Sequence, residues 1–270
     1  MKTIGVFDSG LGGLSVLHAL LLEMPDARYV YLADGAYTPY GGRSTEQVAE
    51  RAHRITQRLH QDYAVDALVV ACNTATAMAI ESLRQEHPDW PIVGVEPALK
   101  PAAALSRSGH IGVLATRGTV ESERFARLRA RVESESRHPL HFNCQACDGL
   151  ADAIERGDEA TTRVLCARYL DALRANANTP APMDTLVLGC THYPFAADIL
   201  QALSGPDVRL VETGGPVARR TRTVLGLPEA SAVVSGTPQI TLLSTGDPAP
   251  LAQASTRWLG TTVGATHLDL

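Results

Sequence analysis

Short apolar runs alternate with amphipathic stretches along most of the chain. After the first run, Leu14, Leu17, Leu21 and Leu22 follow the i, i+3, i+7, i+8 spacing of a helix face. We expect strands at 4–7, 28–33, 67–71, 92–95, 111–115, 140–144, 186–188, 208–211 and 239–243. Alternation of strands with helices predicts an α/β protein with mostly parallel sheets and helices on both faces.

Polar and proline residues mark where the intervening helices begin and end. Ser44 and Gln47 have capping-box spacing, Pro25 ends the first helix, and Asp247-Pro248 is typical of a helix start. Pro97 and Pro101 indicate a crossover between domains. We therefore expect one domain at 1–97 plus 207–270 and a second at 98–206.

An internal repeat supports two related domains. Ile4–Phe7 (IGVF) resembles 111–114 (IGVL), and 67–74 (ALVVACNT) resembles 185–192 (TLVLGCTH). The pairs are offset by 107 positions (4 to 111) and 118 positions (72 to 190), which indicates an insertion between them. The repeat predicts two α/β halves related by a pseudo-twofold axis, with an active site in the cleft between them.

Both halves place a cysteine directly after a buried strand. Asp8, Cys72, Thr116 and Cys190 all follow strand ends, where the loops of an open α/β sheet line the ligand crevice. A thiol has a reference pKa of about 8.5, so one thiolate and one thiol can coexist near neutral pH. Two opposed thiols could remove a proton from one face of a carbon and deliver one to the other, inverting a stereocentre.

Composition excludes several other classes of protein. The 270 residues carry a formal net charge of −5, which argues against binding nucleic acid through clustered positive charge. No apolar run approaches the ~18–20 residues that cross a membrane, and the first residues leave no room for a secretory signal. We expect a cytoplasmic protein whose five cysteines are free thiols.

Three other sequence features suggest alternative sites. His138, His141, Cys144 and Cys147 suggest zinc, but four ligands within ten residues do not easily converge on one ion, so no metal site is expected. The Cys144–Cys147 pair fits a thioredoxin-like redox role poorly, and the pattern DSGLGGLS at 8–15 is not a dinucleotide fingerprint.

Four ordered motifs resemble glutamate racemases of the aspartate/glutamate racemase superfamily. They are DSGLGG at 8–13, PYG at 39–41, ACNTA at 71–75 and GCTHYP at 189–194. The resemblance implies interconversion of L- and D-glutamate without a cofactor, D-glutamate for peptidoglycan synthesis, and a homodimer. An aspartate racemase or a maleate isomerase-like enzyme is the alternative within the superfamily, and a non-catalytic amino-acid-binding module is the alternative outside it.

The resemblance also assigns roles to residues. It implies that Cys72 and Cys190 are the acid/base thiols, assisted by Asp8 and His192, and Glu155 joins them because it lies eight positions after Cys147. Residues matched to substrate contacts are Asp8, Ser9, Tyr40, Gly41, Asn73, Thr74, Thr116, Thr119, Thr191 and His192.

Overall fold

The computed structural model describes residues 1–177, 179–228 and 238–270. It divides into two units, Met1–Val95 with Gly214–Leu270 (unit 1) and Glu96–Thr213 (unit 2). The chain passes between them at 95/96 and 213/214, where the sequence suggested 97/98 and 206/207.

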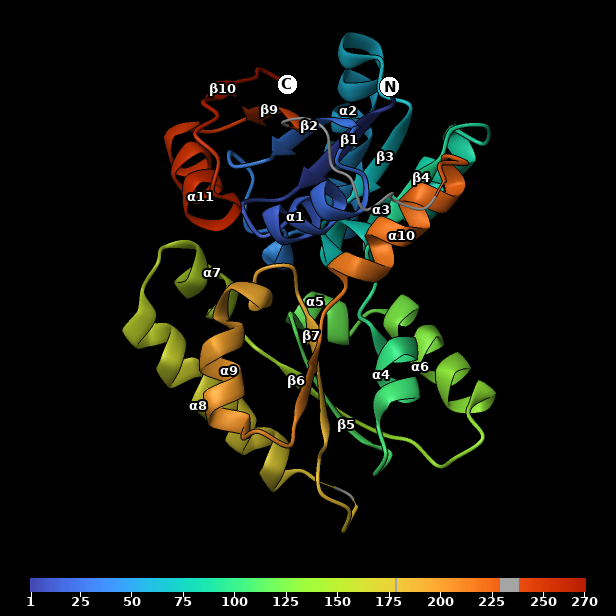
Figure 1. Ribbon diagram of the computed structural model, residues 1–270, viewed down its shortest axis with the longest axis vertical. Coiled ribbons are helices and arrows are strands. Elements are labelled where there is room, and N and C mark those ends of the chain that lie inside the picture. Colours follow the sequence, from blue (N-terminus) through green and yellow to red (C-terminus); the bar gives the residue numbers. More distant parts are fainter. Residues whose placement is uncertain (178, 229–237) are drawn as a thin grey trace. The chain divides into compact units, whose positions relative to one another are not determined.

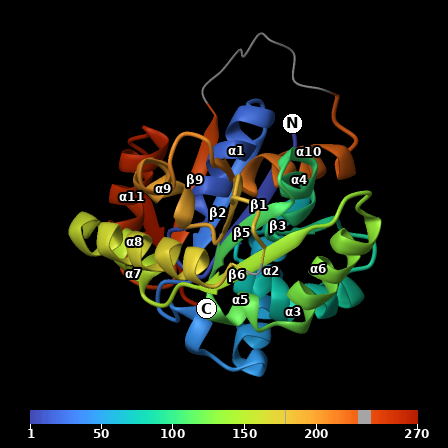
Figure 2. The same ribbon diagram turned by 90° about the horizontal axis from the view of Figure 1, so that it is seen from below.

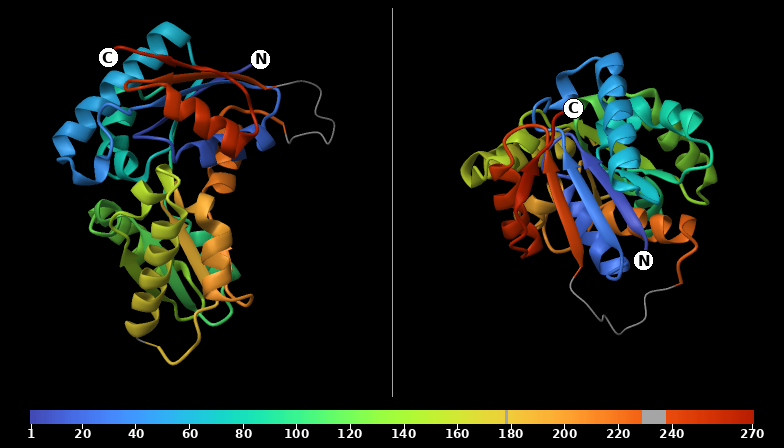
Figure 3. Two further views of the ribbon diagram at one scale, coloured as in Figure 1. Left: turned by 90° about the vertical axis from the view of Figure 1, so that its left-hand side faces the viewer. Right: turned by 90° about the horizontal axis from the view of Figure 1, so that it is seen from above.

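Unit 1 is built on a sheet in which all paired strands are parallel, in the order β10-β9-β2-β1-β3-β4. Its strands are β1 (Thr3–Asp8), β2 (Arg28–Ala33), β3 (Ala67–Val70), β4 (Ile92–Gly94), β9 (Gln239–Ser244) and β10 (Ala265–His267). Strand β9, from the end of the chain, lies beside β2 (Figure 3). The sheet thus joins segments far apart in the sequence.

Helices cover both faces of this sheet (Figure 2). Helices α1 (Leu14–Glu23), α10 (Gly214–Val224) and α11 (Ala249–Leu259) form one layer, and α2 (Thr45–Tyr63) and α3 (Asn73–Glu86) form the other, with η1 (Tyr40–Gly42) before α2. The predicted capping box is confirmed at α2, where Ser44 Oγ accepts from the Gln47 amide at 3.3 Å and Gln47 Oε1 accepts from the Ser44 amide at 3.2 Å.

Unit 2 has a smaller parallel sheet in the order β6-β5-β7-β8. Its strands are β5 (His110–Ala115), β6 (His141–Ala146), β7 (Thr185–Gly189) and β8 (Arg209–Val211). Its helices are α4 (Leu99–Leu105), α5 (Arg117–Val120), α6 (Glu123–Glu135), α7 (Leu150–Glu155), α8 (Glu159–Ala175), η2 (Tyr193–Ala196) and α9 (Ala197–Ser204). Figure 1 shows α4 and α6 on one side of this sheet and α8 and α9 on the other.

The two sheets carry the sequence repeat in matching places. The order β2-β1-β3-β4 in unit 1 corresponds to β6-β5-β7-β8 in unit 2. Ile4 pairs with Ala67, and the matched Ile111 pairs with Thr185. The similar segments therefore occupy equivalent strands in the same register, and equivalent loops follow them.

Helices α4 and α10 and strand β10 are among the elements that were not predicted from the sequence. Pro101 lies in the first turn of α4, where its missing N–H costs no helical hydrogen bond. The Gly-Gly-Pro start of α10 is typical of a turn, yet a Cβ at Gly214 would lie 3.0 Å from the Cβ of Ala19 in α1. Close packing of α10 on α1 explains that glycine.

Candidate active site

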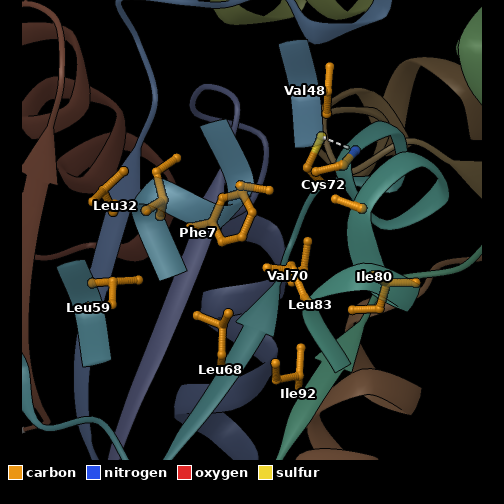
Figure 4. Close-up of a cluster of buried hydrophobic side chains, with 14 of the residues drawn as sticks. Phe7, Leu32, Val48, Leu59, Leu68, Val70, Cys72, Ile80, Leu83 and Ile92 are labelled. Carbon is orange, nitrogen blue, oxygen red and sulfur yellow. Dashed lines mark hydrogen bonds between the residues drawn. The ribbon is translucent and has the colours of Figure 1, made fainter. Parts of the chain in front are cut away.

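Cys72 lies at the carboxyl end of β3, where it caps helix α3. Its Sγ accepts a hydrogen bond from the Ala75 amide at 3.4 Å, and the residue is 5% exposed. Figure 4 shows Cys72 at the end of the hydrophobic cluster of unit 1, near Val48. The sheet and the helix together fix the position of this thiol.

Asp8 ends the neighbouring strand β1, which pairs with β3, and Ser9 follows it. The Cys72 thiol donates to Ser9 Oγ at 3.6 Å, and Asp8 Oδ2 accepts from the Gly13 amide at 2.7 Å. A Cβ at Gly13 would lie only 2.7 Å from the Cβ of Asp8, so glycine permits this close approach.

Burial and the Asp8 carboxylate raise the pKa of Cys72 to about 12. Hydrogen bonds from the Ala75 amide and from Ser9 lower this pKa, but they do not offset the loss of solvation. The raised pKa favours the protonated thiol of Cys72 at neutral pH.

Asn73, which follows Cys72, has a buried side-chain amide. The residue is 5% exposed, and neither its Nδ2 nor its Oδ1 is hydrogen-bonded to any residue that the structure describes. A buried, unsatisfied amide is costly, so such a group in a native protein calls for a ligand or water. Thr74, also buried, follows it in the first turn of α3.

The PYG segment is held by a buried ion pair that sequence reasoning missed. Tyr40 Oη donates to Asp34 Oδ2 at 2.6 Å, and Arg51 binds both oxygens of Asp34, at 3.0 Å through Nε and 2.7 Å through Nη2. The Tyr40 hydroxyl is thus engaged with Asp34, whereas Gly41 is exposed. Asp34 directly follows β2 as Asp8 ends β1, so the strand-end rule could have identified it.

Unit 2 surrounds Cys190 with a different set of groups. Cys190 follows β7 and lies 3.7 Å from His192 Nδ1, measured from Sγ, while His192 Nε2 lies 2.6 Å from Glu155 Oε2. Cys190 and His192 are buried, and Glu155 is at the end of α7. The three side chains form a thiol–imidazole–carboxylate relay.

Burial lowers the pKa of His192, but the hydrogen bonds to Cys190 and Glu155, and the charges of these groups, raise it well above its usual value. A basic imidazole beside a thiol can accept the thiol proton. Burial also raises the pKa of the Cys147 thiol, and the Tyr193 hydroxyl lowers it in part. Tyr193 and Cys147 were not assigned roles from the sequence.

The three threonines predicted in unit 2 lie in loops after adjacent strands. Thr116 Oγ1 is 2.9 Å from Thr119 Oγ1 in the loop after β5, and Thr191 follows Cys190. Thr119 and Thr191 are buried, and Thr116 is half-buried. Strands β5 and β7 are paired, so these hydroxyls share one edge of the sheet.

The other sequence candidates can be located as well. Cys72, Cys144, Cys147, Cys166 and Cys190 are all free thiols. Within the described ranges, no group of three or more His, Cys, Asp or Glu side chains is arranged to hold a metal ion. Over the same residues, no helix is long and apolar enough to cross a membrane.

Comparison with known families defines the class of protein. The model of the Asp/Glu/Hydantoin racemase family matches residues 13–218. The chain therefore belongs to this family of racemases.

Individual relatives narrow the resemblance to one activity. The glutamate racemase of Pseudomonas syringae pv. tomato is 44% identical over 246 residues, 90% of this chain and 85% of that protein. A glutamate racemase isoform from Bacillus anthracis matches in structure with a TM-score of 0.84 and 30% identity, covering 100% of this chain and 98% of that one. The Escherichia coli glutamate racemase, solved with L-glutamate and the activator UDP-MurNAc-Ala, has a TM-score of 0.82 and 33% identity over 99% and 97% of the two chains.

Proposed function

We propose that this protein interconverts L- and D-glutamate without a cofactor, with Cys72 and Cys190 as the two acid/base groups. The observation that carries the proposal is the equivalent placement of the two thiols, each directly beyond a central strand in matching register. A protein that only binds an amino acid has no use for a second thiol at the equivalent position.

The reaction needs one thiolate and one thiol. The thiolate removes the α-proton of glutamate, the electron pair is held by the carbon and its carboxylate, and the other thiol donates its proton to the opposite face. Reversing these roles returns the starting enantiomer. The mechanism therefore requires that both thiols reach the same α-carbon, and each must be able to exist in either protonation state.

Different neighbours prepare the two thiols. His192, held by Glu155, lies where its imidazole can accept the proton of Cys190 during the reaction. Cys72 is protonated when substrate is absent and serves as the donor. In the reverse direction, Cys72 gives up its proton, and Asp8 assists this proton transfer. The Ser9 hydroxyl, which accepts a hydrogen bond from the Cys72 thiol, lies close by.

The substrate's polar groups match the polar groups left at the strand ends. In unit 1, the Asn73 amide, Ser9 and Thr74 offer donors and acceptors for the amino and carboxylate groups, with Gly41 of the PYG segment. In unit 2, Thr116, Thr119, Thr191 and His192 offer donors for a carboxylate. Tyr40 contributes by holding the PYG segment through Asp34.

A cofactor-independent reaction agrees with the surroundings of the two lysines in the chain. Lys2 pairs with Asp66 at 2.7 Å near the start of β1, and Lys100 pairs with Glu135 at 3.1 Å on the surface of unit 2. Neither lies beside the strand ends that carry the thiols. Neither is therefore suited to form a Schiff base with a substrate bound there.

We further propose that the enzyme is a cytoplasmic homodimer that supplies D-glutamate for peptidoglycan synthesis. The cellular role is tested by depletion: cells should lose their shape, and added D-glutamate should restore it. Light scattering after size-exclusion chromatography should give twice the mass of the chain. A monomer mass would contradict the homodimer without affecting the reaction.

The activity is tested on protein dialysed against EDTA with no pyridoxal phosphate added. Circular dichroism should show L-glutamate approaching a racemic mixture, and L-aspartate should remain optically active. In deuterated water, deuterium should appear chiefly in the product enantiomer, because a second, solvent-equilibrated thiol donates the proton. Racemisation of aspartate alone would assign the alternative substrate, and activity that returns only with a metal or pyridoxal phosphate would overturn the mechanism.

Joint protection tests whether one ligand engages both thiols. Glutamate should slow the alkylation of Cys72 and of Cys190 to the same extent, as measured by mass spectrometry of the labelled peptides. Protection of one thiol only would contradict a shared substrate. The alkylation of Cys144, which is half-buried and is not assigned a role, is the internal control.

A further inference from the structure

We infer that unit 1 has a second ligand site, a cationic cavity on α2 that binds a small oxyanion such as a phosphoryl or carboxylate group. The cavity has a volume of about 140 Å³. Its lining consists of Tyr37, Tyr40, Arg43, Gln47, Val48, Glu50, Arg51 and Arg54, so that it shares Tyr40 with the PYG segment. None of its lining residues carries a thiol, and the proposed glutamate reaction does not require an anion there.

Arg51 supplies the observation that points to a ligand. The residue is 5% exposed, and its Nε and Nη2 are both bound to Asp34. The remaining nitrogen, Nη1, is buried and has no hydrogen-bond partner among the described residues. Because Nε and Nη2 face Asp34, Nη1 faces away from it, on a side chain that lines the cavity. A buried guanidinium nitrogen without a partner is costly and calls for an acceptor.

The other polar groups of the lining are mostly donors as well. Arg43 donates its Nε to the Tyr37 carbonyl at 3.3 Å and has no ion pair with any described residue. Gln47 uses its amide oxygen in the capping box, which leaves its Nε2 available. Arg54 is only loosely paired with Glu50, at 3.8 Å, and both are largely exposed.

Charge and shape favour an anion over a neutral or cationic ligand. Three guanidinium groups line the cavity, and the two nearby carboxylates, Glu50 and the buried Asp34, leave one positive charge in excess. Arg51 also stacks on the ring of Tyr37, with its Cζ 3.8 Å from the ring centre, so its orientation is fixed before any ligand arrives. Guanidinium groups of fixed orientation are well suited to the paired oxygens of phosphate and carboxylate.

The cavity also adjoins the segment that we assign to the proposed active site. Arg51 binds Asp34, and Asp34 accepts a hydrogen bond from the hydroxyl of Tyr40, which itself lines the cavity. An anion on Arg51 Nη1 would therefore contact the side chain that holds the PYG segment in place. Binding is the property that tests the site, because it does not depend on the proposed reaction.

Isothermal titration calorimetry with inorganic phosphate, and separately with acetate, at constant ionic strength tests this site. The double variant Arg43→Gln/Arg54→Gln removes two surface guanidiniums and keeps the buried Arg51–Asp34 pair. Arg58→Gln is the matched control: Arg58 lies on the same helix, pairs with Asp62 at 2.7 Å and does not line the cavity. Far-UV circular dichroism and thermal unfolding check that all three proteins are folded.

We expect saturable 1:1 binding that weakens at least about tenfold in the double variant and less than about twofold in the control. If phosphate alone binds, the ligand is a phosphoryl group. If acetate binds and its affinity falls by the same factor in the double variant, the ligand is a carboxylate. No saturable binding of either anion, or equal binding by the native protein and the double variant, would overturn the site. An equal loss in Arg58→Gln would also overturn it, because net charge alone would then explain the effect.

Discussion

Cys72 and Cys190 have equivalent positions in the two units but opposite electrostatic surroundings. Each follows a central parallel strand, and those strands pair in the same register with their neighbours. Cys72 has a carboxylate nearby, from Asp8, that opposes its ionisation. Cys190 has instead an imidazole at 3.7 Å that can take its proton. The repeat thus sets where each thiol lies, and the neighbours differ: a carboxylate acts on Cys72, and an imidazole lies beside Cys190.

The difference arises from short stretches of sequence in equivalent loops. Asn73 and Thr74 follow Cys72, and Thr191 and His192 follow Cys190, so His192 replaces Thr74 in the repeat. Helix α7 then brings Glu155 to the far nitrogen of that imidazole. This substitution, supported by one carboxylate, gives Cys190 a basic neighbour that Cys72 lacks.

The strongest test of the comparison replaces each thiol in turn. Cys72→Ser and Cys190→Ser should each lower racemisation by about 10³-fold or more, because a hydroxyl gives up its proton far less readily than a thiol near neutral pH. Serine is nearly isosteric, so the fold should persist by circular dichroism.

Each serine variant should nevertheless retain the removal of the α-proton by the thiol that remains. With β-chloroglutamate, one thiolate removes the α-proton and chloride leaves without reprotonation. The two variants should therefore eliminate chloride from opposite enantiomers. If both prefer the same enantiomer, or if either racemises glutamate at a near-native rate, the assignment of two opposed thiols is wrong.

A weaker perturbation removes the imidazole from one side only. His192→Asn should lower kcat by about 100-fold, since it removes the group that accepts the Cys190 proton. In deuterated water, exchange of the α-proton should slow for one glutamate enantiomer much more than for the other. Equal slowing for both enantiomers would show that His192 does not serve one thiol alone.

Much of this comparison could be predicted from the sequence. Local sequence patterns predict the strands, the two thiols and the Ser44–Gln47 cap. The internal repeat predicts that the chain contains two related α/β halves. The Arg51–Asp34 pair could not be found this way, because it joins residues 17 positions apart and exists only once α2 packs on the sheet. Helix α10 was missed because Gly214 serves close packing on α1, which no local pattern reveals.

A smaller effect is expected from the carboxylate behind the imidazole. Glu155→Gln keeps a hydrogen-bond acceptor but removes the charge that helps to raise the pKa of His192. We expect kcat to fall by about tenfold, and the pH–rate limb that belongs to His192 to move to lower pH. Glu155→Asp should restore part of the native profile. A loss of activity with an unchanged pH profile would indicate a purely structural role for Glu155.

The smallest effect concerns stability, and it tests the protonated state assigned to Cys72. Because burial, aided by Asp8, raises the pKa of Cys72 from 9.0 to about 12, the folded protein keeps this proton at a pH where the unfolded chain loses it. A raised pKa adds stability that is complete below pH 9 and declines as the pH rises from there towards 12. At pH 10 this decline should be on the order of 1 kcal/mol of the free energy of unfolding, and Cys72→Ser should lack this contribution. Urea unfolding of the native protein and of Cys72→Ser at pH 7 and pH 10 measures this decline. Between pH 6 and 7 the thiol is protonated in the folded and the unfolded state, so the stabilities of the two proteins should depend on pH in the same way. An equal decline in both proteins at pH 10 would mean that Cys72 ionises as readily in the folded protein as in the unfolded chain, and the contrast with Cys190 would then have to come from His192 alone.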